Sequence, residues 1–152
     1  MATKLASRPG VYASDFYVWA EEQAALLRAK RFDALDLDHL IEEVEGLADA
    51  KRSAVLNDAR VVMEHLLKLE YSPAIDPRNK WRATVREHRN RLEADLTPRL
   101  LQVLDDELGR WYGLARKTAD ASMRDHGEHA AADALPETCP YTRDQVTGDW
   151  LP

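Results

Sequence analysis

Residues 97–127 read TPRLLQVLDDELGRWYGLARKTADASMRDHG and carry the most regular pattern in the sequence. Apolar or small residues recur there at steps of three and four, which is the period of one face of an α-helix. Thr97 suits the N-cap, Pro98 suits the first helical position, and Gly127 suits the position just after a helix end. The pattern predicts a long helix whose buried stripe is Leu101, Leu104, Leu108, Trp111, Ala115, Thr118 and Ser122.

The residues before position 97 show the same periodicity in further segments. Residues 15–32 predict one helix, and a longer apolar stripe follows it, interrupted once at Lys51 beside Gly46. Glycine inside a helix costs about 1 kcal/mol relative to alanine. We therefore expect two helices, at about 36–47 and 50–71, with one kinked rod as the alternative.

Prolines divide the rest of the chain. A loop at residues 72–79, which contains two prolines, precedes a helix whose stripe is Trp81, Val85, His88 and Leu92. Residues 130–140 form a polar connector, and Thr142 with Gln145 has the spacing of a capping box. The sequence thus predicts an all-α fold, an antiparallel bundle of about five helices plus a short C-terminal turn.

Length and composition place these helices in one globular domain. The 152 residues are 45% hydrophobic and 32% charged, which is enough apolar material for a core. We expect a single helical domain over residues 1–152, with 1–13 and 130–152 as less regular ends. Cys139 is the only cysteine, so an intrachain disulfide is excluded and a reducing compartment is favoured. No apolar run resembles a leader or a membrane span, and we expect a cytoplasmic protein that does not bind membranes.

No stretch carries the motif of a common catalytic site. The sequence lacks a Gly-rich phosphate loop, the Gly-x-Ser-x-Gly turn and the His-Glu-x-x-His zinc motif. We expect no cofactor, and candidate sites must come from side chains that helical spacing gathers.

One such candidate is a cluster of titratable residues in the predicted core. Glu43, His65 and His88 each lie within or beside an apolar stripe, so the three side chains could face one interior. They could hold a divalent metal or act as an acid/base pair. The simpler interpretation is a buried hydrogen-bonded pair, and on that interpretation we expect no metal.

A second candidate is a stripe of arginines on the helix after the loop. Arg78, Arg82, Arg86 and Arg89 share one face, and residues 78–91 have a net charge of +5. This face could bind phosphate groups or nucleic acid. However, residues 36–49 have a net charge of −6, so pairing of the two blocks, within the chain or across a dimer, is the favoured interpretation.

A third candidate is the pair His126 and His129 together with Cys139 downstream. These are zinc-ligand types, but the spacing fits no familiar zinc site. A histidine in the last turn of a helix is explained by the helix dipole alone.

Several short phrases of the sequence occur together in an order that resembles a known family. They are Asp15-Phe16-Tyr17, Trp19-Ala20, Glu22-Gln23, Leu40-Ile41-Glu42-Glu43-Val44-Glu45, His65-Leu66-Leu67-Lys68, Cys139-Pro140-Tyr141-Thr142 and Asp149-Trp150-Leu151-Pro152. Over essentially its whole length the chain resembles the bacterial family of domains of unknown function numbered twenty-nine. The resemblance implies an all-helical fold and supplies no catalytic residue.

The sequence therefore favours a non-enzymatic module that binds a protein partner or a second copy of itself through the acidic and basic helices. Two alternatives stay open. One is a small metal-dependent or acid/base enzyme that uses Glu43, His65 and His88. The other is a nucleic-acid-associated protein that uses the arginine stripe.

Overall fold

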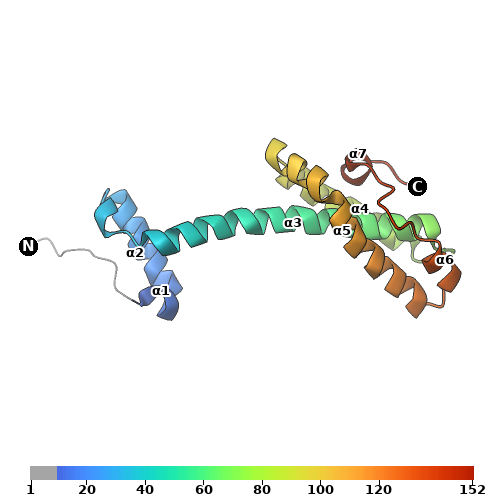
Figure 1. Cartoon of the computed structure of the whole chain (residues 1–152), viewed down its shortest axis with the longest axis horizontal. Coiled ribbons are helices and arrows are strands. Elements are labelled where there is room, and N and C mark those ends of the chain that lie inside the picture. The colour runs from blue at the N-terminus through green and yellow to red at the C-terminus, as the bar shows by residue number, and fades with distance from the viewer. Residues whose placement is uncertain (1–9) are drawn as a thin grey trace, which may run out of the picture. The chain divides into compact units, whose positions relative to one another are not determined.

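The computed structural model describes residues 10–152, and these form helices without any β-strand (Figure 1). The predicted all-α fold is confirmed. No helix in this described range is both long and apolar enough to cross a membrane. The elements are α1 (Val11–Ser14), α2 (Phe16–Arg28), the 3-10 helix η1 (Phe32–Ala34), α3 (Leu37–Tyr71), α4 (Arg78–Asp95), α5 (Pro98–Asp125), α6 (His129–Asp133) and α7 (Arg143–Thr147).

Helix α3 is continuous from Leu37 to Tyr71, so the favoured prediction of two separate helices is wrong and the alternative of one rod is the correct one. Gly46 lies inside it without a break. The glycine costs about 1 kcal/mol, whereas ending and restarting a helix leaves up to four N–H and four C=O groups without intrahelical partners. Continuing the helix through Gly46 therefore costs less free energy than a break would.

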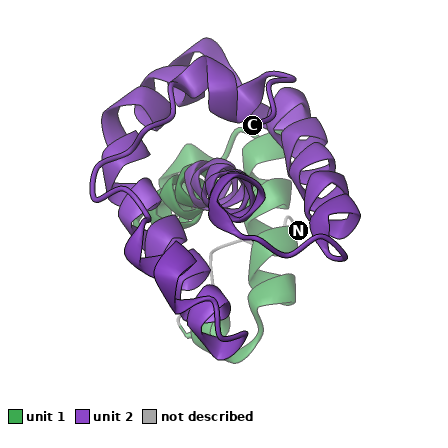
Figure 2. Cartoon of the chain, turned by 90° about the vertical axis from the view of Figure 1, so that its right-hand side faces the viewer, with its two compact units in different colours: residues 1–49 green, residues 50–152 purple. Residues whose placement is uncertain are grey.

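The chain divides into two compact units, residues 1–49 and 50–152 (Figure 2). Helix α3 contributes its first turns to one unit and its remainder to the other, so the expectation of a single domain stays a prediction. Residues 1–9 of the expected irregular N-terminal end lie outside the described residues. Both expected irregular ends contain short helices, namely α1 in one and α6 and α7 in the other.

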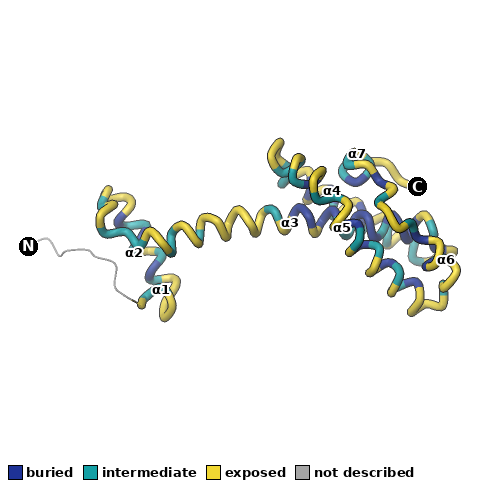
Figure 3. Tube along the Cα trace, in the orientation of Figure 1, coloured by how far each residue is buried: buried dark blue, intermediate teal, exposed yellow. Residues whose placement is uncertain are grey.

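Burial changes sharply along α3 (Figure 3). The apolar residues of its first turns are largely exposed, and Val44 and Leu47 are 65% and 71% exposed. From Val55 onward the same stripe is buried. The first unit has few buried residues of its own, among them Trp19, Gln23 and Leu26 of α2.

The core lies in the second unit, where α3 meets α4 and α5. Leu104 is fully buried as predicted, while Leu108 and Trp111 pack against the core and are only partly buried. Further along α5 the predicted face is wrong by one position, since Thr118 is exposed whereas Ala119 is buried. The core comprises Val55, Leu56, Ala59, Val62, Met63, Leu66, Leu67, Leu69, Val85, Leu92, Leu104, Tyr112, Ala115, Ala119, Met123, Ala132, Leu135, Tyr141 and Val146.

The predicted caps of α5 and α7 are confirmed. The Thr97 hydroxyl accepts a hydrogen bond from the Leu100 amide at 3.3 Å, with Pro98 in the first helical position. Gly127 follows α5 with φ 76°, a left-handed conformation that glycine adopts without steric cost. The capping box of Thr142 and Gln145 starts α7.

Candidate functional site

The first unit contains an apolar groove of about 330 Å³ between α2 and the first turns of α3. The side chains that form it combine low polarity with high exposure, and Phe16 and Leu27 of α2 are about half exposed. Its lining residues are Phe16, Trp19, Ala20, Gln23, Ala24, Leu27, Leu40, Glu43, Val44 and Leu47. Sequence periodicity had assigned most of these residues to a core, and the groove was therefore missed as a site.

A hydrogen-bonded joint around Asp36 holds the two walls of this groove together. The indole N–H of Trp19 donates to Asp36 Oδ2 at 3.1 Å, and His39 Nδ1 lies 2.8 Å from the same oxygen. The Asp36 backbone N–H donates to Gln23 Oε1 at 2.9 Å. The hydrogen bond with His39, and after it the one from Trp19, lowers the pKa of Asp36. The carboxylate thus ties α2 to the start of α3.

Tyr12 supports the joint from α1. Its ring stacks on His39 with centroids 3.9 Å apart, and its hydroxyl donates to Glu43 Oε1 at 2.7 Å. The hydrogen bond to Glu43 is the main cause that raises the pKa of Tyr12. Edge contacts between Tyr12, Phe16 and Trp19 complete an aromatic cluster. The groove is therefore built on a rigid base.

The first turns of α3 are acidic. Glu43 lies in the groove wall itself. Four more carboxylates follow one another at steps of three and four on the side of the helix that faces away from the groove. Within residues 10–152 these four are exposed and form no ion pair. They are Asp38, Glu42, Glu45 and Asp49.

The predicted cluster of Glu43, His65 and His88 is not assembled. Glu43 is bonded to Tyr12 in the first unit, whereas both histidines belong to the second. The prediction required a chain reversal near Asp49, and none exists because α3 is continuous. Across residues 10–152 no three or more His, Cys, Asp or Glu side chains are grouped so that they could hold a metal ion.

Each histidine has a different partner from the one expected. His88 Nδ1 lies 2.6 Å from Asp58 Oδ1, and both side chains are largely buried. His65 Nδ1 donates to the Val61 carbonyl oxygen at 2.9 Å. The sequence analysis did not select Asp58. It lies between apolar positions of α3, and a polar residue at such a position was the only feature of the sequence that indicated a buried hydrogen bond.

Two of the four predicted arginines bind backbone carbonyl groups. Arg78 donates to the carbonyl oxygen of Leu69 at 2.6 Å, near the C-terminal end of α3. Arg89 is 9% exposed and donates to three carbonyl oxygens, those of Gln145, Val146 and Trp150. Both guanidinium groups thus donate to carbonyl oxygens at or just beyond the ends of α3 and α7, a common role of basic side chains at helix C-termini.

The other two arginines, Arg82 and Arg86, are exposed on α4. Neither forms an ion pair with any residue in the range 10–152. They line a shallow hollow of about 240 Å³ together with Asp149 and Leu151, and Leu151 is itself 40% exposed. The predicted four-arginine stripe is therefore reduced to a basic patch of two residues beside an apolar one.

The third predicted group does not form a zinc site. His126 Nδ1 donates to the Ser122 carbonyl oxygen at 2.7 Å, as expected in a last helical turn. The Cys139 thiol instead contacts Met63 and donates to the Tyr141 carbonyl oxygen at 3.5 Å. Burial raises the pKa of this thiol.

A family model described as Domain of unknown function DUF29 matches residues 11–151. The chain belongs to this family. The match confirms the resemblance that the sequence phrases indicated. DUF29 membership names no activity, so any function must be argued from the sites themselves.

A solved structure supports the DUF29 fold. It is the crystal structure of an alpha-helical protein of unknown function from Rhodospirillum rubrum, at 1.45 Å resolution. It is 25% identical to this chain, the match covers 92% of this chain and 90% of that one, and the TM-score is 0.68. No curated protein matches this chain.

Proposed function

We propose that this DUF29 protein is a self-association module, in which the apolar groove of the first unit receives a second copy of the chain. The observation that carries the proposal is the exposure of Phe16, Leu27, Val44 and Leu47 around one groove. A contiguous apolar surface bordered by polar residues is typical of a protein interaction site.

The net charge of the first turns of α3 favours a basic and apolar occupant, because residues 36–49 carry a charge of −6. Glu43 lies in the groove wall, and unpaired carboxylates such as Glu42 and Glu45 lie on the other side of the same helix. The same chain carries a matching surface on α4, where Arg82 and Arg86 lie beside Leu151. A second copy therefore supplies both the positive charge and an apolar side chain.

Such a contact is heterologous, because the groove of one copy binds a different surface of the next. A symmetric contact between two grooves would instead bring two acidic segments, residues 36–49 of each copy, close together, at a cost in repulsion. Heterologous contacts form closed rings or open chains, depending on the rotation between copies. We expect assembly that is concentration-dependent and weakened by salt.

Sedimentation velocity over a range of protein and salt concentrations tests this proposal. Leu47→Glu places a charge in the groove and should give a monomer, and Arg82→Glu with Arg86→Glu should weaken association. Adding Glu42→Arg and Glu45→Arg to the second variant, which lowers the negative charge of the same helix segment without changing the groove lining, should restore part of it. Ile75→Glu is the matched control, since Ile75 is 80% exposed and lies outside the groove.

Two results would overturn the proposal. One is a monomer at every concentration, and the other is an oligomer that Leu47→Glu leaves intact. A monomer whose groove binds only a basic amphipathic peptide would replace self-association by a foreign partner.

A further inference from the structure

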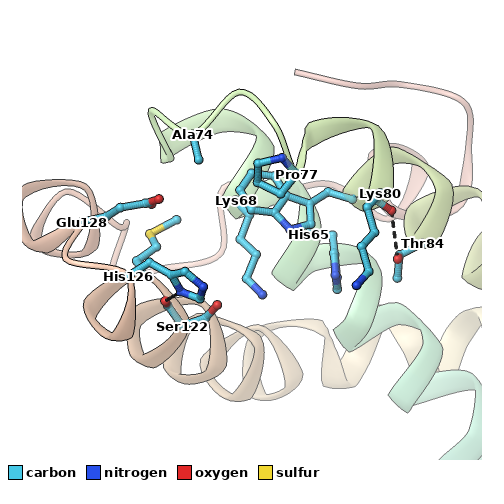
Figure 4. Close-up of a pocket in the computed structure, with 11 residues that line it drawn as sticks. His65, Lys68, Ala74, Pro77, Lys80, Thr84, Ser122, His126 and Glu128 are labelled. Carbon is cyan, nitrogen blue, oxygen red and sulfur yellow. Dashed lines mark hydrogen bonds between the residues drawn. The ribbon is translucent and has the colours of Figure 1, made fainter.

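The second unit contains a cavity of about 450 Å³ bounded by α3, α4 and α5 and by the loop between α3 and α4 (Figure 4). This volume is in the range of small-molecule sites, and the cavity is separate from the groove of the first unit. Its lining residues are His65, Lys68, Ala74, Pro77, Lys80, Trp81, Thr84, Ser122, Met123, His126 and Glu128.

We propose that this cavity binds a small molecule that carries a phosphate or carboxylate group on a flat apolar body. The inference is independent of self-association, because none of the lining residues belongs to the groove. It is supported by the positive charge of the cavity, by the hydrogen-bonding groups of its lysines and histidines, and by its apolar lining.

The charge of the site is positive. Lys68 is 8% exposed, and its Nζ donates to Glu64 Oε1 at 2.7 Å. The same carboxylate also accepts a hydrogen bond from Arg60 at 3.3 Å. One negative charge thus serves two cations, and Lys80 adds a third cation at the cavity wall. The only carboxylate among the lining residues is Glu128.

The lysines present donors that a ligand oxygen can use. An ammonium group carries three N–H donors, and Lys68 has one hydrogen bond, to Glu64. The Lys80 side chain has none in the described part of the chain. In Figure 4 the side chains of Lys68, His65 and Lys80 extend in the same direction. An anionic group placed at their ends would neutralise the excess charge with charge-assisted hydrogen bonds.

The hydrogen bonds of the two lining histidines define the role of their second nitrogen. Because a carbonyl oxygen only accepts, Nδ1 of His65 carries the proton that it shares with Val61, and Nδ1 of His126 does the same with Ser122. Each Nε2 is therefore an acceptor in the neutral ring and a donor after protonation. The neutral form can accept from a ligand hydroxyl group, and the protonated form can donate to a phosphate oxygen.

Part of the cavity lining is apolar. Trp81 offers a large ring, and Ala74, Pro77 and Met123 add further apolar side chains. Aromatic rings stack on flat apolar groups, which assigns the body of the ligand to these side chains. Binding sites of this kind combine an apolar lining with a few convergent polar groups, and this cavity has both.

Isothermal titration calorimetry with four probes tests the inference, namely inorganic phosphate, phenyl phosphate, benzoate and benzyl alcohol. Phenyl phosphate or benzoate should bind measurably and benzyl alcohol should not. The two anionic probes distinguish phosphate from carboxylate as the preferred group. Weaker binding of inorganic phosphate than of phenyl phosphate would show that the apolar wall contributes.

Lys80→Met is the decisive variant, because Lys80 is exposed and its loss leaves the fold intact. It should weaken the anionic probes by about tenfold or more, which equals about 1.4 kcal/mol. Lys117→Met, on the exposed side of α5 and outside the cavity, is the matched control. Lys68→Met, checked by circular dichroism, should have a larger effect than Lys80→Met.

The inference fails if no probe binds, if benzyl alcohol binds as well as benzoate, or if Lys80→Met and Lys117→Met behave alike. Leu47→Glu should leave probe binding unchanged. This separates the outcome from that of the self-association experiment.

Discussion

Replacing Arg89 with methionine should destabilise the protein by about 3–5 kcal/mol. The guanidinium donates to Gln145 O at 2.6 Å, Trp150 O at 2.7 Å and Val146 O at 3.1 Å. A hydrogen bond to a charged group contributes about 1.5–3 kcal/mol, so three would give about 4.5–9 kcal/mol. Gln145 and Trp150 are not fully buried, and water can replace part of the lost bonds. A loss of about 3–5 kcal/mol, at or below the lower end of this range, is therefore expected.

Unfolding in guanidinium chloride, followed by circular dichroism, measures this change in the free energy of unfolding. Methionine is chosen because it keeps the apolar stem of the side chain packed. Arg86→Met is the control, since it removes an exposed guanidinium one turn earlier on α4 and should change stability by less than about 0.5 kcal/mol. Arg89→Lys should recover only a fraction, because a point-like ammonium cannot match three diverging carbonyls. Equal effects of Arg86→Met and Arg89→Met would refute the reasoning. Early hydrogen exchange at Val146 would show that α7 detaches first.

Three further predictions concern the core and its titrating groups. Leu104→Ala, at a fully buried position, should cost about 2–5 kcal/mol, whereas Leu47→Ala in the exposed stretch of α3 should cost less than about 0.5 kcal/mol; chemical denaturation of both tests the burial boundary. Burial raises the pKa of Tyr112 from 10.0 to about 12. The contribution of its neutral hydroxyl to stability should therefore be complete below pH 10 and lost as the pH rises through about 12. Tyr112→Phe, which also removes the hydrogen bond to Pro136, should make stability depend less on pH in this range. Burial lowers the pKa of His65 below 6.5, so stability should fall as the pH drops through 6.5, and an unchanged acid slope in His65→Gln would contradict this.

Local chemistry made the helix ends of the second unit predictable. Thr97 with Pro98, Gly127, and the pair Thr142 and Gln145 each satisfy backbone groups within a few residues, so no knowledge of the fold is needed. The continuity of α3 was not predictable in this way. Gly46 lowers helix propensity locally, but the cost of a break is decided by the whole helix on both sides of it.

The prediction of the Glu43, His65 and His88 cluster was wrong for a related reason. Helical spacing shows which residues share a face, and it placed His88 correctly beside the core. It does not show which residue of another helix that face meets, so Glu43 was chosen where Asp58 is the partner. On α5 two neighbouring rows of residues are both apolar enough to be buried. Packing into the core of the second unit selects the row that contains Ala119.

The first turns of α3 expose apolar side chains, and packing within the described residues does not explain why they are apolar. Ile41, Val44 and Leu47 repeat the period of the buried half of the helix, yet each is more than half exposed. Burying such a side chain contributes about 1.5–3 kcal/mol, whereas leaving it in water favours association of exposed surfaces. Polar residues at these positions would keep the helix and remove that tendency. The proposed occupant of the groove would remove Val44 and Leu47 from water, and the net charge of −6 on residues 36–49 favours a basic occupant.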